Sequence, residues 1–272
     1  MAMKKRTKGN ITAPSLPGKD MLAEVNNNEA GNIYNSLFAK NRKVEYDNKD
    51  IALVNIRTNP DNQIFRAMDD DEDIRILAED IKRNGLMHNL VVFPEQEEGS
   101  TVYVLLSGER RFRALNYLQE KGDATWNIVN CNVVTTPLAE NEKKVLLYSA
   151  NLQVRGGFSD EAIRRQAIAE FITCLQREPY NMSREEALNA TKSVSTVNPR
   201  TIERDARIEE KLKGKLKTLL NDKFLTRSEC ENYLRFEADK QDEIANRFEK
   251  LQAVDCHSDD AESAGKNYVE VL

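Results

Sequence analysis

Histidine and cysteine are scarce in this sequence. It has two histidines, His88 and His257, and four widely separated cysteines with no Cys-x-x-Cys pair. A multi-histidine metal centre, a zinc site and a disulfide framework are therefore not indicated. No apolar run approaches the ~20 residues that cross a bilayer, and the first residues do not resemble a signal peptide. We expect a cytoplasmic protein with no membrane partner.

Positive charge is not in excess either. The 45 acidic residues outnumber the 40 lysines and arginines, which gives a formal net charge of −5. This balance argues against nucleic-acid binding as a property of the whole surface, but nucleic acid responds to a local patch rather than to the total. The acidic stretches 69–73 and 259–262 leave room for a basic face elsewhere.

The chain divides into four predicted segments. Residues 1–48 contain the basic cluster 4–8 and few periodic apolar residues, so we expect a disordered basic arm, or an arm that grips a partner. Residues 49–155 should form a first folded domain and residues 156–251 a second one. Residues 252–272 are expected to be a flexible tail, too short for a core of its own.

The first domain is predicted to be α+β. Strand-like runs occur at 51–56, 90–93, 101–106 and 128–134, and amphipathic helices at 71–84, 109–118 and 139–150. After residue 156 the pattern is helical throughout. Ser159, Ser183, Asn198 and Thr226 stand at expected helix starts, and a last helix should end near Leu251. The fold class is therefore α+β, with a small mixed domain followed by an all-α domain.

The transition from strand to helix at Ser107 and Gly108 favours anion binding. Residues 102–118 read VYVLLSGERRFRALNYL. The first N–H groups of a helix are unpaired, its dipole is positive there, and glycine lets a ligand approach the backbone. Arg110 and Arg113 share a face and can bracket phosphate oxygens. Arg111 points toward the apolar side, where a structural ion pair is the simpler expectation.

Residues 108–114, GERRFRA, resemble the phosphate-binding motif Gly-Glu-Arg-Arg-x-Arg-Ala of ParB-family partition proteins. Residues 85–90, GLMHNL, and 150–155, ANLQVR, resemble the first and third boxes of that family, in the required order. The resemblance covers roughly residues 50–250. It implies a ParB/sulfiredoxin-like mixed domain that binds CTP, followed by a helix-turn-helix domain. A sulfiredoxin-type redox role is disfavoured because residues 107–114 contain no cysteine.

The resemblance also implies a nucleotide site and a magnesium ligand. The nucleotide-binding residues it implies are Gly85, Ser107, Gly108, Glu109, Arg110, Arg111, Arg113 and Asn151. The implied cofactors are CTP and Mg²⁺, with Asn151 as the remaining metal ligand. Ala150 replaces the family glutamate that helps to hold magnesium, and a methyl group cannot ligate that cation. Val154, His88 and Asn89 are further departures. We therefore expect weak or absent hydrolysis, which leaves open whether the protein is an enzyme.

DNA-binding residues are expected on the second helix of the helix-turn-helix. Residues 185–190, the turn at 193–197 and the helix from Pro199 fit that motif, with Val194, Val197, Ile202 and Ala206 in the core. The outward residues expected to meet DNA are Thr196, Asn198, Arg200, Thr201 and Arg204. An ordinary helical hairpin with a solvated charged face is the alternative.

The sequence thus predicts a divergent ParB-like protein of DNA partition or mobile-element maintenance, associated with a nucleoid or plasmid. Double-stranded DNA, a ParA-like ATPase and a second copy of the chain are its expected partners. The family's C-terminal dimerisation domain is not expected here. A metal-dependent nuclease or phosphotransferase on the same fold, and a nucleotide-free protein-interaction adaptor, are the alternatives.

Overall fold

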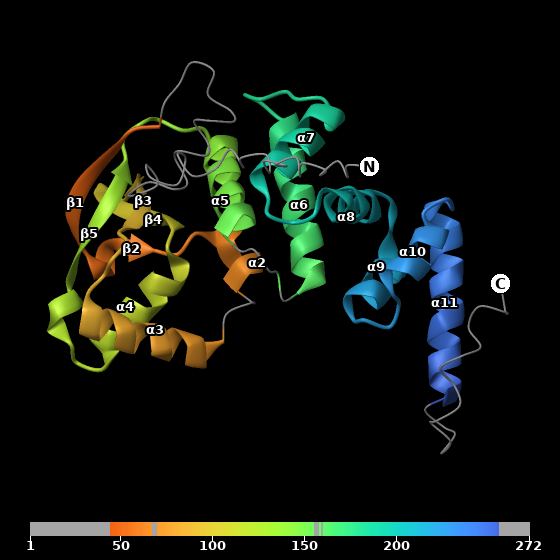
Figure 1. The fold of residues 1–272 in the computed structure, drawn as a ribbon, viewed down its shortest axis with the longest axis horizontal. Coiled ribbons are helices and arrows are strands. Elements are labelled where there is room, and N and C mark those ends of the chain that lie inside the picture. The colour runs from red at the N-terminus through yellow and green to blue at the C-terminus, as the bar shows by residue number, and fades with distance from the viewer. Residues whose placement is uncertain (1–43, 67–69, 155–157, 159, 256–272) are drawn as a thin grey trace, which may run out of the picture.

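The computed structural model describes residues 44–66, 70–154, 158 and 160–255. A mixed sheet with its covering helices forms one end of the elongated molecule, and a series of helices runs from it to the other end (Figure 1). The expected α+β part followed by a helical part is confirmed. No described helix is long and apolar enough to cross a membrane.

Five strands form the sheet in the order β1-β5-β3-β4-β2. They are β1 (Tyr46–Ala52), β2 (Ile56–Arg57), β3 (Leu90–Glu97), β4 (Ser100–Ser107) and β5 (Ile128–Val134). The β1–β5 and β3–β4 pairs are antiparallel, whereas β3–β5 and β2–β4 are parallel. The turn between β3 and β4 uses positive φ angles at Glu98 and Gly99, as a tight hairpin requires.

The sheet is covered on both faces. Helices α3 (Asp71–Asn84) and α4 (Glu109–Glu120) pack on one face, where Val92 and Leu105 join Ile74, Ala78 and Leu115 in a buried cluster. Helices α2 (Gln63–Arg66) and α5 (Glu140–Val154) pack on the other face (Figure 1). Both faces of β3 are buried, because successive side chains of a strand point to opposite sides.

Six further helices follow within the described residues. They are α6 (Glu161–Gln176), α7 (Arg184–Val194), α8 (Pro199–Lys211), α9 (Gly214–Asn221), α10 (Arg227–Tyr233) and α11 (Ala238–Asp255). Short 3-10 turns occupy Leu53–Asn55, Pro60–Asn62 (η2) and Ala124–Trp126. Ser183 and Thr226 each form a complete capping box, and Asn198 caps α8 with Pro199 as its first residue, as the sequence predicts.

Three predicted boundaries differ from the structure. The fold begins before residue 49, because Val44 is buried and β1 starts at Tyr46. Asp160 caps α6, since its Oδ1 accepts from the N–H groups of Ala162 and Ile163. Ser159, the arm through residue 43 and the tail from residue 256 lie outside the described residues, and α11 extends to Asp255.

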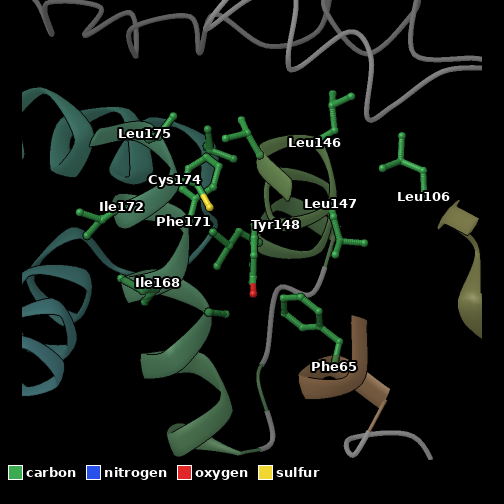
Figure 2. Packing of buried hydrophobic residues seen from close by; sticks show 14 of the residues in the cluster. Phe65, Leu106, Leu146, Leu147, Tyr148, Ile168, Phe171, Ile172, Cys174 and Leu175 are labelled. Atoms are coloured by element: carbon green, nitrogen blue, oxygen red, sulfur yellow. The ribbon is translucent and has the colours of Figure 1, made fainter. Parts of the chain in front are cut away.

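The predicted boundary at residue 155 does not separate two cores. One buried cluster includes Phe93 and Leu106 of the sheet, Leu146 of α5, Phe171 of α6 and Ile202 of α8. Figure 2 shows its centre, where Phe65, Tyr148 and the α6 side chains pack together. A separate buried cluster, formed by residues from Ile208 to Ala245, begins only in the second half of α8. The sheet and the helices α5 to α8 are therefore built around a shared core.

Candidate functional site

The strand register brings the motif segments toward the end of the sheet where β4 finishes and β3 begins. Ser107, the end of β4, lies opposite Val91 near the start of antiparallel β3, so residues 85–90 arrive at that edge. Arg57 of parallel β2 lies opposite Val104, and the chain then continues into η2 on the same side. Asn62 of η2 in turn contacts Asn151 of α5. The strand pairing thus brings residues 85–90 next to residues 107–108, and η2 contacts the segment 150–155 through Asn151.

Gly108 occupies the turn from β4 into α4. Its φ angle is +104°, in the left-handed region, and a Cβ atom placed there would lie 2.8 Å from Leu90 Cδ2. Only glycine fits both constraints. Gly108 has no side chain with which to cap α4, and the positive end of the helix lies where β4 ends. The strand, glycine and helix start of the predicted anion cradle are therefore all present in the structure.

Arg111 ties the first motif segment to the second. Its Nη1 donates to the carbonyl oxygens of His88 at 2.6 Å and Asn89 at 3.0 Å. These two bonds let Arg111 position the loop after Gly85. Gly85 itself ends α3 with φ +82° and donates to Ile81. Glu109, the first residue of α4, is buried.

Arg110 and Arg113 face the acidic first turn of α3. Arg113 Nη2 lies 2.9 Å from Asp71 Oδ1, and Arg110 Nη2 lies 3.8 Å from Asp73 Oδ2. The Asp71 side chain is 84% exposed, whereas that of Arg113 is 17% exposed. A phosphate that used these guanidinium groups would compete with carboxylates at the solvent boundary, where ion pairs are weak.

The residues of the third box supply little for a cation. Asn151 donates from Nδ2 to Leu147 O at 2.9 Å and to Asn62 Oδ1 at 3.5 Å, and its amide oxygen is the type of ligand that a hard cation takes. Ala150 is buried and offers none. No group of three histidine, cysteine, aspartate or glutamate side chains suited to a metal occurs among the described residues. This donor set suits a cation carried by a nucleotide's phosphates rather than one held by the protein.

The second candidate site lies on α7, α8 and the turn between them. Val194, Ile202 and Ala206 are buried and Val197 packs against them, as the sequence predicts. The predicted DNA-facing positions Thr196, Asn198 and Arg200 are exposed, and Thr201 is half-buried. Asn198 also accepts from the Arg200 N–H at 2.9 Å, so its side-chain oxygen caps the helix.

A charged groove with a volume of about 750 Å³ follows the outer face of α8. The side chains that line it are Arg184, Leu188, Arg200, Glu203, Arg204, Arg207, Glu210, Lys211 and Glu231. The sequence prediction included only two of its cations, Arg200 and Arg204. The recurrence of basic residues at positions 200, 204, 207 and 211 could have identified the whole stripe, since these spacings share one helix face. Arg184 and Glu231 come from other helices, which no local pattern reveals.

The groove's cations differ in how they are held. Arg204 is half-buried, and its Nη2 donates to Ser228 Oγ at 3.0 Å and Glu231 Oε2 at 2.6 Å, so it faces α10 rather than standing free on α8. The Arg200 guanidinium makes no ion pair with any described residue. Lys192 bonds to Glu203 and holds the pKa of that carboxyl below its usual range.

Residues 37–140 match the sequence model of the ParB N-terminal domain. A comparison with curated proteins finds no match. Among solved structures, this chain is similar to a C-terminally truncated chromosome-partitioning protein ParB from Caulobacter crescentus complexed with CTP-gamma-S. The identity is 18%, the match covers 74% of this chain and 98% of that one, and the TM-score is 0.32.

Two other solved structures are similarly distant. The same Caulobacter crescentus protein complexed to the centromeric parS site shows 15% identity over 77% of this chain and 98% of that chain, with a TM-score of 0.29. A Pnob8-like ParB-N domain shows 10% identity over 79% and 85% of the respective chains, with a TM-score of 0.40.

Proposed function

We propose that this chain, whose residues 37–140 match the ParB N-terminal domain, is a DNA-binding partition protein with a CTP-type nucleotide pocket at the start of α4. The observation that supports this most directly is the Gly108 turn, where a Cβ atom would collide with Leu90. The turn sets the positive end of a helix directly after a strand, within the motif that carries the family resemblance. The preference for cytosine rests on that resemblance alone.

The described residues have distinct proposed roles in holding a triphosphate. The N–H groups of Glu109, Arg110 and Arg111 would donate to phosphate oxygens, with the loop after Gly85 held in place by the Arg111 side chain. Arg110 and Arg113 would exchange Asp73 and Asp71 for phosphate oxygens. Such an exchange replaces one charge-assisted hydrogen bond with another and exposes the carboxylates to water.

We expect hydrolysis to be weak or absent. When bound, Mg²⁺ would neutralise phosphate charge, and the protein ligand expected to face it is Asn151. Ala150 provides no carboxylate to fix the ion, so phosphate charge would be neutralised without the geometry that turnover needs. Steady CTP turnover by the purified protein with magnesium would contradict this part of the proposal.

The second proposed activity is binding of double-stranded DNA through a helix-turn-helix formed by α7, residues 195–198 and α8. Exposed Arg200 near the start of α8 is placed as the N-terminal part of a recognition helix would be. Arginine reads guanine edges with two parallel hydrogen bonds. Association with a nucleoid or plasmid, pairing of two copies and a ParA-like ATPase partner belong to the same proposal.

Isothermal titration of the full chain with CTP, and separately with ATP and GTP, tests the nucleotide site. Saturable binding of CTP in preference to the other two is expected. The same protein is then titrated with random and genomic duplex DNA, and its mass in solution is measured with and without CTP. DNA binding without CTP binding would remove the nucleotide pocket, whereas binding of neither would favour a protein-interaction adaptor. Cleavage of DNA with magnesium or manganese would favour the nuclease alternative.

A further inference from the structure

The charged groove on α8 contains both partners of several ion pairs. Glu210 accepts from Arg184 Nε at 3.0 Å, and Glu231 accepts from Arg204 Nη2 at 2.6 Å. The five cationic side chains that line the groove are therefore interleaved with three carboxylates. A surface that only attracted phosphate would not need carboxylates among its cations.

Glu231 of α10 is the most heavily engaged of these carboxylates. Its Oε2 accepts from Arg204 at 2.6 Å, and its Oε1 accepts from Arg207. Each oxygen thus faces a different arginine of α8, which is how a phosphate group would be held between two guanidinium groups. The Glu231 side chain is 27% exposed, so solvent screens this contact less than the surrounding pairs.

The position of Glu231 is built into the fold rather than left to a mobile loop. Helix α10 begins with the Thr226–Glu229 capping box and buries Cys230 and Tyr233 in the cluster that also contains Ile208 of α8. Ser228 adds a hydrogen bond to Arg204 at 3.0 Å. The carboxylate is therefore presented to the arginines by a helix whose own packing fixes its place.

We propose that Glu231, assisted by Glu210, acts as an internal substitute for DNA phosphate and lowers the affinity of the groove for DNA that offers only its backbone. The inference rests on the proposed DNA binding through α8. Nonspecific DNA must displace a carboxylate from Arg204 and Arg207 before phosphate can occupy them. Arg200, which has no such partner among the described residues, remains ready to contact a base edge. Glu231 is thus a specificity-determining residue.

The test compares Glu231→Gln with wild type in titrations of a random-sequence duplex over a range of salt concentrations. Glutamine keeps an oxygen to which Arg204 can donate, but it lacks the negative charge that competes with phosphate. We expect about tenfold tighter binding, and a plot of log affinity against log salt steeper by up to about two, because two arginines become available to phosphate. Glu210→Gln, on a half-exposed pair with the single arginine Arg184, should also tighten binding, with about half the increase in slope.

Glu243→Gln is the matched control. It removes one negative charge from α11, where Glu243 pairs with Lys240 and Arg247 outside the groove. Equal effects of Glu231→Gln and Glu243→Gln would overturn the inference, because net charge alone would then explain them. Weaker binding by Glu231→Gln would also overturn it. If wild type binds DNA and both groove variants match it, only this inference fails. If no variant binds DNA at low salt, the proposed DNA binding fails with it.

Discussion

The Asp205 carboxylate of α8 accepts a hydrogen bond of 2.7 Å from Arg164 Nε of α6, and the exposed fractions of the two side chains are 0% and 11%. The other carboxylate oxygen lies 3.5 Å from Arg227 Nη1 of α10. The buried face of the proposed recognition helix is thus fixed by charge from two neighbouring helices, while its opposite face carries the groove.

Asp205→Ala should destabilise the protein by about 3–5 kcal/mol, because it leaves the largely buried Arg164 side chain without its closest anion. Unfolding in urea followed by circular dichroism measures this change. Glu203→Ala removes an exposed carboxylate from the same helix and should leave the midpoint nearly unchanged. If the two variants unfold at the same urea concentration, the Asp205 contact does not hold α8 in place.

Gly108→Ala should destabilise the protein by about 2 kcal/mol or more and abolish CTP binding. The added methyl group meets Leu90 and is strained at φ +104°. Gly122→Ala is the control, since its φ is +88° but nothing lies within 4 Å of the new atom, so it isolates the backbone strain at about 1 kcal/mol. Normal CTP titration by Gly108→Ala would show that the turn is not the phosphate cradle.

Asp71→Asn should tighten CTP binding by about threefold, because Arg113 no longer has to release a carboxylate before it meets phosphate. Asp80→Asn makes the same charge change on α3, where Asp80 accepts from Asn84 and pairs with no arginine of the described residues. The comparison is a pair of calorimetric titrations at low salt. Equal affinities for the two variants would place Arg113 outside the nucleotide site.

Stability should fall at alkaline pH through the buried thiols. Burial raises the pKa of Cys131 and of Cys230 to about 12 from the ordinary 9.0. Below pH 9 both thiols stay protonated in the folded and in the unfolded chain, so their contribution to stability is fully present. As the pH rises from 9 toward the pKa of the folded state, the thiols ionise only in the unfolded chain. Each thiol then lowers the free energy of unfolding by about 1.4 kcal/mol per pH unit.

Urea unfolding at pH 8, 9 and 10 under reducing conditions measures this decline. Cys230→Ala lowers stability at every pH by removing packed atoms, but its free energy of unfolding should decline less steeply above pH 9 than that of wild type. Parallel curves for the two proteins would mean that the Cys230 thiol is not protected from ionisation.

Local signals in the sequence predicted much of the fold. The capping residues Ser183, Asn198 and Thr226 act within three positions of themselves, so the pattern of nearby residues determines them. The start of β1 was missed because this edge strand exposes most of its side chains and shows no apolar alternation. The shared core across residue 155 was missed because it depends on packing between distant elements.

The candidate sites show the same division. The Gly108 turn is visible in the sequence because strand, glycine and helix are consecutive. The ion pairs Arg113–Asp71 and Arg204–Glu231 join residues that are far apart in the chain, and from sequence alone Asp71 and Glu231 could equally have faced solvent. Such ion pairs depend on the packing of α3 against α4 and of α10 against α8, which the sequence pattern does not predict.

Arg200→Ala should separate base reading from phosphate contact at α8. If Arg200 binds a base edge, its loss removes hydrogen bonds that only the preferred sequence offers, at about 1–3 kcal/mol, while binding of random DNA changes little. The preferred duplex is obtained by selecting genomic fragments with the wild-type protein, and both duplexes are titrated at one salt concentration. Arg247→Ala, an exposed arginine of α11, controls for the lost charge. Equal weakening of both duplexes would make Arg200 a phosphate contact, because a contact that ignores sequence cannot contribute to the difference between them.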